Sequence, residues 1–434
     1  MKRILLIIAV LCCVLLTACS GLSITGYDVL SPPEMHGARS ALRELIIESA
    51  GGAYTPVYPS SGEYQNGVIE RDIDGDGDDE AIAFCRTKDD ATLILCCHKS
   101  GSGYTAAGNA TLKGAVIDTI DFADLDGDGR EELIILYPDA DSPRSSLTVV
   151  SMTDTVAQAD MPASYNAYII TDLDGDDARD ILLLSQSSAV GSASASLLGY
   201  QNGRLSVRSA CEMDSQMTAY TKITCGQVSP GVSGVFVDGC TAPGEYTTQV
   251  LYYDASHDSL MNPLFIYRGY DSTRRTEEIT SADIDGDGLI EFPVCSLCDY
   301  NEQEPPETVC RRLTWNNYRI ADMELISKKT AILCEHEGFL FNIEDVRVGA
   351  VTARYSAPDT VALYTWEYSD GEMRCTDLLL TIRRYEKTVY TPDTTLGTTL
   401  TMTSDAVYTY EINPAAGIHS FTESEVKGGF IVME

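Results

Sequence analysis

Four short segments concentrate carboxylates at a fixed spacing. Each segment begins with Asp, carries further acids at its third, fifth and ninth positions, and has glycine at its fourth position. The segments begin at Asp72, Asp124, Asp172 and Asp283. Four carboxylates confined to one loop repel one another by about 1 kcal/mol per pair in water, and by more when they are partly desolvated. The spacing therefore predicts loops that fold around a hard cation.

Calcium is the cation that this ligand set favours. It accepts six to eight oxygen ligands in flexible geometry, whereas magnesium requires near-ideal octahedral coordination and is bound by few carboxylates. We expect about four calcium ions, each held by the acids at positions one, three, five and nine and by the backbone carbonyl at position seven. Loop by loop, the expected ligands are Asp72, Asp74, Asp76, Asp78 and Glu80; Asp124, Asp126, Asp128, Arg130 and Glu132; Asp172, Asp174, Asp176, Ala178 and Asp180; and Asp283, Asp285, Asp287, Leu289 and Glu291.

The EF-hand is the alternative calcium motif, because its loop also begins Asp-x-Asp-x-Asp. An EF-hand needs an acid at position twelve and a helix on each side. Position twelve is apolar in all four segments: Ala83, Ile135, Leu183 and Val294. Short apolar runs such as residues 133–136 and 181–184 leave the loops, which is typical of buried strands. The sequence therefore favours loops between strands.

The acidic segments mark an internal repeat. Their starts are separated by 52, 48 and 111 residues, and a copy without carboxylates, Gly226–Gly234, falls in the longest interval. Five units of about 53 residues therefore run from near Tyr64 to near Ser327. A unit of this length with some four short strands matches one blade of a β-propeller.

These residues resemble the FG-GAP/VCBS repeats of integrin-like propellers and bacterial surface proteins. The Asp-x-Asp-Gly-Asp-Gly-x-x-Glu core matches closely at Asp72, Asp124 and Asp283, and the resemblance covers roughly residues 60–327. It implies a β-propeller with a calcium ion in one hairpin loop of each blade. Asp177 departs from the pattern because it replaces a glycine, and the unit at Gly226 should bind no metal. We expect calcium to fasten the hairpins rather than to contact a ligand.

The N-terminus predicts export and lipid anchoring. Residues 1–18 combine two basic residues, an apolar run and small residues, as a secretory signal peptide does. Leu16–Cys19 resembles the bacterial lipobox, which implies cleavage before Cys19 and lipid attachment to its sulfur. Residues 19–52 are predicted to form a tether and one helix, which starts near Ser31 and stops at Gly51. The expected location is extracytoplasmic, anchored to the bacterial cell membrane.

The remaining chain completes the predicted fold class. We expect a mainly β protein in which residues 53–327 form the propeller and residues 328–434 form a small, β-rich α+β domain. The sequence Thr422-Glu-Ser-Glu425 has the form of a capping box for a short final helix. Together with the N-terminal helix, these elements define four segments with boundaries at 18/19, 52/53 and 327/328.

Cysteine and histidine give weaker signals. Cys295 and Cys298 are spaced like a redox or zinc half-site, and Cys85, Cys96, Cys97 and His98 form a comparable group. Cysteine also behaves as a small buried hydrophobe, and on a strand an odd separation places two thiols on opposite faces. The five histidines are widely spaced and accompany no nucleophile or zinc-hydrolase motif. We therefore expect no enzyme, although 65 acids leave paired-carboxylate glycoside hydrolysis open.

The charge balance limits the classes of partner that the protein can bind. The 434-residue chain has 30 Lys and Arg against 65 Asp and Glu, a formal net charge of -35. Nucleic-acid binding requires a positive field, so that class is excluded. The leading prediction is a membrane-anchored lipoprotein whose propeller is a non-catalytic module for an extracellular protein or glycan. The alternatives are a propeller enzyme that acts on extracellular polysaccharide and a structural component of an envelope complex.

Overall fold

The computed structural model describes residues 38–101, 103–114, 116–138, 145–152, 156–163, 165–187, 192–268, 270–300, 304–369, 371–392 and 395–433. The predicted signal peptide, Cys19, the tether and the helix start at Ser31 lie outside these residues. The chain divides into two compact units, residues 1–121 with 150–157 and residues 122–149 with 158–434. Within the described ranges, no helix has both the length and the apolar character needed to cross a membrane.

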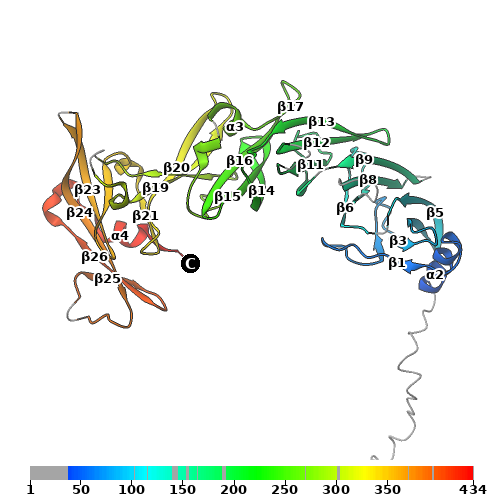
Figure 1. The fold of residues 1–434 in the computed structure, drawn as a ribbon, viewed down its shortest axis with the longest axis horizontal. Coiled ribbons are helices and arrows are strands. Elements are labelled where there is room, and N and C mark those ends of the chain that lie inside the picture. The colour runs from blue at the N-terminus through cyan, green and yellow to red at the C-terminus, as the bar shows by residue number, and fades with distance from the viewer. Residues whose placement is uncertain are drawn as a thin grey trace, which may run out of the picture. The chain divides into compact units, whose positions relative to one another are not determined.

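The protein is mainly β, as predicted, and its strands form six antiparallel sheets of four or five strands (Figure 1). We number the sheets in chain order. Sheets 1 to 3 contain β1 (Thr55–Pro56), β2 (Val68–Arg71), β3 (Glu80–Arg86), β4 (Thr92–Ser100) and β5 (Gly103–Leu112); β6 (Thr119–Ala123), β7 (Glu132–Pro138), β8 (Ser145–Met152) and β9 (Val156–Ala163); and β10 (Ala167–Thr171), β11 (Asp180–Ser185), β12 (Ser194–Gln201) and β13 (Arg204–Glu212).

The other three sheets lie in the second unit. They contain β14 (Ala219–Ser229), β15 (Val232–Ala242), β16 (Glu245–Asp254) and β17 (Ser259–Met261); β18 (Phe292–Leu297), β19 (Arg311–Arg319), β20 (Glu324–Cys334), β21 (Phe339–Ile343) and β27 (Phe430–Val432); and β22 (Val351–Ala357), β23 (Thr360–Ser369), β24 (Glu372–Glu386), β25 (Thr398–Met402) and β26 (Ala406–Ile412).

Helices are short and few in the described chain. The predicted N-terminal helix is confirmed as α2 (Ala38–Ser49), whose Leu42 and Ile46 are buried against sheet 1. It ends where predicted, because Gly51 and Gly52 take positive φ angles of 71° and 130°. The remaining helical elements are α3 (Pro263–Arg268), α4 (Glu423–Gly429) and four 3-10 turns, η1 (Tyr270–Thr273), η2 (Pro306–Thr308), η3 (Asp345–Arg347) and η4 (Pro414–His419).

Each acidic segment is the loop between two antiparallel strands or, before sheet 5, between the two residues of an antiparallel bridge. In sheet 1, Arg71 of β2 lies opposite Glu80 of β3, and in sheet 3, Thr171 lies opposite Asp180. In sheet 2 the second acidic loop likewise connects the neighbouring strands β6 and β7. Before sheet 5 the first strand is reduced to a single antiparallel bridge between Ala282 and Glu291. The prediction of loops between strands is thus confirmed, and no helix flanks them.

In the second unit, apolar clusters connect successive sheets. Each cluster takes buried side chains from two neighbouring sheets, as expected when apolar faces of small sheets pack together. Representative pairs are Ile134 with Leu183 for sheets 2 and 3, Leu184 with Val235 for sheets 3 and 4, Phe236 with Phe292 for sheets 4 and 5, and Phe341 with Leu380 for sheets 5 and 6.

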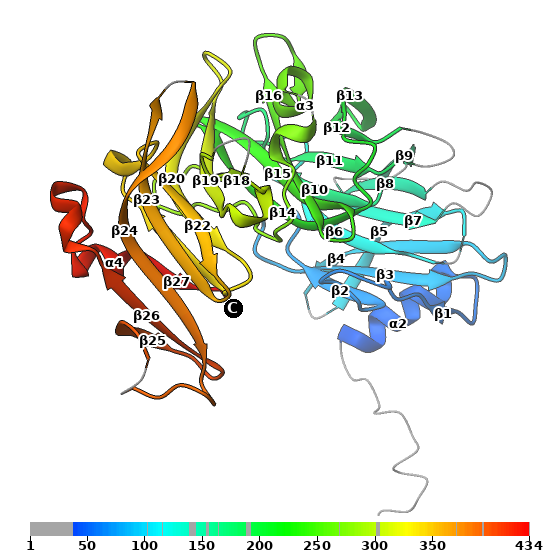
Figure 2. The same cartoon turned by 60° about the vertical axis from the view of Figure 1, so that its left-hand side comes forward.

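The C-terminal region forms sheet 6, and the last strand of the chain returns to sheet 5. Sheet 6 has the order β22-β23-β24-β26-β25 (Figure 2), and β27 pairs with β21 so that Phe430 lies opposite Phe341. The predicted capping box is confirmed, because the Thr422 side chain accepts from the backbone of Glu425 while the Glu425 side chain accepts from the backbone of Thr422. The expected boundary at residues 327 and 328 falls inside β20.

Candidate metal sites

The first acid of each loop organises the backbone in the same way. One carboxylate oxygen of Asp72 accepts from the N–H of Gly75 at 2.8 Å, and the other accepts from the N–H of Gly77 at 3.0 Å. The corresponding bonds at Asp124, Asp172 and Asp283 measure 2.7 to 3.2 Å. All four loops therefore share one local fold, which follows from the first acid and the residues at positions four and six.

The last acid of each loop is buried and points back into the loop. Glu80, Glu132, Asp180 and Glu291 have exposed fractions of 1%, 3%, 7% and 0%. One oxygen of each accepts from the backbone N–H of the residue at position two, at distances from 2.9 to 3.3 Å. Because this acid stands at the start of the second strand, or directly before it, the sheet itself fixes where the carboxylate lies.

The structure brings many of the predicted ligands together. Ligand atoms of the acids at positions one, three and nine lie within 4.8 Å of one another in three loops, and the first loop has two such groups that share Asp74. The groups are Asp124, Asp126 and Glu132; Asp172, Asp174 and Asp180; Asp283, Asp285 and Glu291; Asp72, Asp74 and Asp76; and Asp74, Glu80 and His98.

Position five contributes differently from the prediction. Its carboxylate joins a group only in the first loop, through Asp76, whereas Asp128, Asp176 and Asp287 lie outside the groups of their loops. In every loop this carboxylate accepts from the backbone N–H at position seven, at 2.8 to 3.0 Å. The residues at position seven, Asp78, Arg130, Ala178 and Leu289, thus hold the position-five acid through their N–H groups.

Burial and mutual repulsion raise the pKa values of the clustered acids. Burial, followed by the nearby Asp126 and Asp128 charges, raises the pKa of Glu132 to about 7, against the opposing hydrogen bond from Leu125. Burial likewise raises the pKa of Asp180 to about 6, with Asp174 adding to the rise. The pKa values of Glu80 and Glu291 are also raised, mainly by burial. Such carboxylates favour either a proton or a metal cation as a neighbour.

Basic side chains contact three of the loops. Arg208 forms an ion pair with Asp174 in the third loop, Lys328 contacts Asp287 in the fourth, and Lys99 lies 2.8 Å from Asp78 in the first. In the second loop, among the residues that the structure describes, no basic side chain forms an ion pair with the four acids at positions one, three, five and nine.

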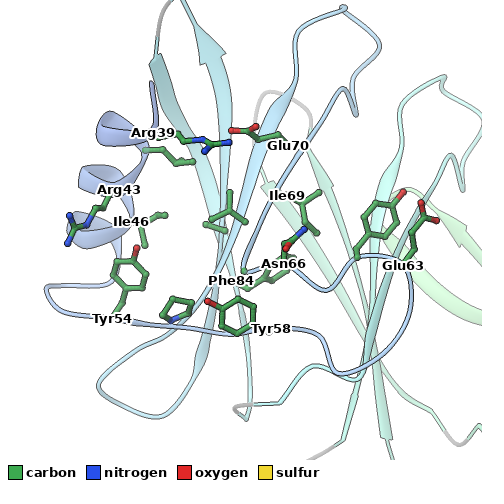
Figure 3. Close-up of a pocket in the computed structure, with 16 residues that line it drawn as sticks. Arg39, Arg43, Ile46, Tyr54, Tyr58, Glu63, Asn66, Ile69, Glu70 and Phe84 are labelled. Carbon is green, nitrogen blue, oxygen red and sulfur yellow. The ribbon is translucent and has the colours of Figure 1, made fainter. Parts of the chain in front are cut away.

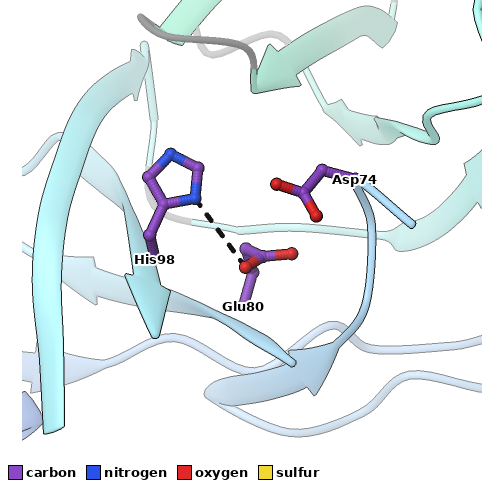
Figure 4. Close-up of side chains that lie close together, drawn as sticks. All are labelled: Asp74, Glu80 and His98. Atoms are coloured by element: carbon purple, nitrogen blue, oxygen red, sulfur yellow. Dashed lines mark ion pairs between the residues drawn. The ribbon is translucent and has the colours of Figure 1, made fainter. Parts of the chain in front are cut away.

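His98 is a candidate ligand whose neighbours the sequence interpretation did not identify. The sequence groups it with three cysteines, whereas the structure places its Nδ1 atom 3.7 Å from Oε1 of Glu80 (Figure 4). Only the pairing of the strands reveals that His98 lies near Glu80. Ala81 of β3 lies opposite Cys97 of β4, so Glu80, which precedes Ala81, and His98, which follows Cys97, are neighbours across the two strands.

The cysteines belong to the packing of the sheets. All eleven cysteines of the described chain carry free thiols. Cys295 lies against one apolar cluster and Cys298 lies inside another, as expected for thiols on opposite faces. Burial raises the pKa of Cys96 to about 12, so this thiol stays protonated at neutral pH.

A cavity of about 680 Å³ lies in the first unit between α2 and sheet 1 (Figure 3). Figure 3 shows Arg39 and Glu70 pointing toward one another at one end, with Tyr54 and Tyr58 on the chain segment that borders the other end. The floor is apolar and includes Ile69. The cavity thus combines aromatic faces with both signs of charge, which suits a polar ligand with an apolar face.

Comparison with protein-family models and with curated proteins finds no match for this chain.

Proposed function

We propose that this protein is a lipid-anchored, extracytoplasmic β-propeller lipoprotein of the FG-GAP/VCBS type. Calcium stabilises its blades, and the propeller is a non-catalytic module that binds an extracellular protein or glycan. The observation that carries the proposal is the recurrence of one loop geometry four times. The buried last acid converges with two other carboxylates in three loops, and with Asp74 and His98 in the first. Carboxylates held this close repel one another, and a cation between them removes that repulsion.

Calcium is the favoured ion for the second, third and fourth loops. Their converging groups contain carboxylate oxygens only, which hard cations prefer. Three carboxylates leave room for backbone carbonyls and water, and calcium accepts such mixed oxygen shells at 2.3–2.6 Å. The raised pKa of Glu132, to about 7, reflects the charge repulsion that a bound cation would remove.

The propeller assignment rests on the repeated sheets. Five successive sheets begin at the predicted repeat positions, and a sixth sheet follows in residues 351–412. Four-stranded antiparallel sheets that pack face to face in chain order are the units of propellers. The apolar clusters between sheets 2 and 3, 3 and 4, 4 and 5, and 5 and 6 support this arrangement within the second unit.

The cavity beside α2 supports a glycan as the ligand. Tyr54 and Tyr58 offer aromatic faces, and Arg43, Asn66 and Glu63 offer donors and acceptors. Tyrosine combines a flat apolar body with a polar edge, so it can contact a sugar ring on one side and hydroxyl groups on the other. Tyr58→Ala should weaken binding in a glycan screen. Tyr368→Ala removes a comparably exposed tyrosine in sheet 6 and should leave binding unchanged.

The decisive experiment is a calorimetric titration of calcium into the chelator-treated protein. We expect about four sites and a higher melting temperature. At a free calcium concentration one hundred times the Kd, each site adds about 2.7 kcal/mol to the free energy of unfolding. Asp126→Ala should remove one site. A melting temperature that does not respond to calcium would contradict the proposal.

Lipid anchoring is tested separately. Mass spectrometry of the protein purified from its membrane should detect a lipid-modified N-terminal Cys19. Cys19→Ser should release the protein into the soluble fraction, because anchoring depends on the buried acyl chains. An unmodified Cys19 in the mature membrane-associated protein would contradict this part of the proposal.

A further inference from the structure

One register position distinguishes the acidic loops. The last acid of the loop is followed by a residue whose partner on the next strand is known: Cys97 in sheet 1, Leu198 in sheet 3 and Asn316 in sheet 5. Continuing each register by one residue places His98, Gly199 and Asn317 across from the last acid. The same place therefore holds an imidazole, no side chain and a carboxamide. Only the imidazole is a strong ligand for transition metals.

In sheet 1 this imidazole completes a group of three ligands. Atoms of Asp74, Glu80 and His98 lie within 4.8 Å of one another (Figure 4). Asp74 comes from the loop, Glu80 from the start of β3 and His98 from β4, so three separate backbone positions aim at one point. Figure 4 shows the imidazole and both carboxylates turned toward the space between them.

The buried carboxylate of Glu80 approaches His98 without reaching hydrogen-bond distance. Its exposed fraction is 1%, and its Oε2 atom accepts from the N–H of Ile73 at 3.3 Å. Its Oε1 atom lies 3.7 Å from Nδ1 of His98, beyond the range of a hydrogen bond. Two ligands bonded to one zinc ion at 2.0–2.2 Å lie roughly 3 to 3.6 Å apart, close to the observed spacing.

We propose that Asp74, Glu80 and His98 form a site for a divalent transition-metal ion of the zinc class. The proposal deepens the proposed function, because it gives the first loop a second cation that it can hold in place of calcium. Calcium takes oxygen ligands, whereas imidazole nitrogen suits zinc, copper, iron and nickel. Asp74 also belongs to the Asp72, Asp74 and Asp76 group, so the two cations compete for the first loop.

The site has the ligand number of a zinc centre that retains an open position. Three protein ligands leave the fourth tetrahedral position to water or to a donor atom of a ligand. His98 is partly exposed, with 34% of its side chain accessible, so the metal can exchange from solvent. The oxygen-only groups of the other three loops lack this nitrogen ligand.

Zinc titration of the chelator-treated protein tests the proposal. His98→Asn gives the first loop the side chain that sheet 5 carries, and it should weaken the strongest zinc site at least tenfold while the protein still binds calcium. His257→Asn is the matched control, because His257 is exposed, pairs with a single acid, Asp254, and belongs to no converging group. The control should leave zinc binding unchanged. Because both variants retain all eleven described thiols, zinc binding to cysteine cancels in the comparison.

A spectroscopic measurement does not depend on how well the variant folds. Copper(II), which accepts imidazole ligands as zinc does, should show electron–nuclear coupling to one imidazole nitrogen when one equivalent is bound to the wild-type protein, and zinc in excess should reduce that signal. Unchanged zinc affinity in a folded His98→Asn protein, or the absence of nitrogen coupling in the wild type, would overturn the proposal. Failure of all calcium binding alongside a His98-dependent zinc site would instead contradict the calcium function and leave this inference standing.

Discussion

The acidic loops and the hairpin of sheet 4 occupy corresponding places in the repeat but are held in different ways. The loops concentrate carboxylates that repel one another and that we propose take a cation from solvent. The connection between β14 and β15 has no acid, and it turns through Pro230 and Gly231, where Gly231 takes a φ of 76°. The Gln227 side-chain oxygen holds this hairpin by accepting from the N–H of Gly231 at 3.1 Å. Farther along β15 the sheet carries its own cation: Arg275 lies 3.2 Å from Asp238, and both side chains are almost completely buried.

The buried pair in sheet 4 belongs to a larger network. Asp238 also accepts from the backbone N–H of Ser281 at 2.8 Å and from the hydroxyl of Thr248 at 2.5 Å. Arg275 donates to the carbonyl oxygens of Thr273 and Ile279, both at 3.0 Å. The network thus fastens the segment that leads into the fourth acidic loop. The comparison teaches that sheets of one kind can be stabilised either by an exchangeable ion, as proposed for the acidic loops, or by a fixed buried ion pair.

The largest expected loss of stability comes from removing Arg275 from the buried ion pair. Arg275→Met leaves Asp238 buried without its partner, and removing one member of a buried ion pair costs about 3–5 kcal/mol. Most of the loss should appear both with calcium and with chelator, because no converging acidic group contains either residue and the network contacts only the segment before the fourth loop. Urea denaturation in both conditions measures it. A loss that appears only with calcium present would break the distinction between the two kinds of closure.

Removing one exchangeable ion should cost less. Glu132→Gln keeps the shape of the side chain but removes a charge from the second loop, so calcium stoichiometry should fall by one and calcium should stabilise the protein by about 1–3 kcal/mol less. Calorimetry and thermal melts measure both quantities.

Gly231→Ala is the matched control in the acid-free hairpin. A Cβ atom there meets open space, but the positive φ makes alanine cost about 1 kcal/mol. Stability should fall by a similar amount with and without calcium, and the number of calcium sites should stay the same. A change in calcium stoichiometry in this variant would show that the hairpin of sheet 4 contributes to metal binding after all.

The two kinds of closure should also differ in their response to pH. In the folded, calcium-free protein the pKa of Glu132 is about 7, well above its ordinary value of 4.5. Between these values the folded state binds a proton that the unfolded state does not, so stability falls as the pH rises from about 4.5 through 7. Thermal melts in chelator should show a flatter pH profile for Glu132→Gln than for the wild type.

Calcium should reverse this contribution, because the metal occupies the site only when the carboxylate is ionised. The apparent calcium affinity should therefore rise over the same pH window. Identical pH profiles of the wild type and Glu132→Gln in chelator would show that the charge of Glu132 is already balanced by another group.

Local pattern explains how much of this architecture the sequence could predict. The loop hydrogen bonds depend on residues no more than eight positions apart, so spacing alone located the acids and the hairpins. The Asp238 and Arg275 pair and the position of His98 depend on strand register, which brings distant residues together. The pairing of β27 with β21 joins positions about ninety residues apart, so no local signal announced it.

The smallest effect sharpens the comparison among the acidic loops themselves. Asp177 holds position six of the third loop with a φ of 73°, where the other loops have glycine at 85° to 91°. Its backbone N–H makes the same bond to the first acid, at 3.2 Å instead of 2.9–3.0 Å. Asp177→Gly should relieve the left-handed strain and stabilise the protein by about 1 kcal/mol, partly offset by the greater freedom of glycine in the unfolded chain. Because Asp177 belongs to no converging group, the number of calcium sites should remain four. A stability gain that is present with calcium but vanishes in chelator would mean that the glycine acts on the bound ion instead of the backbone.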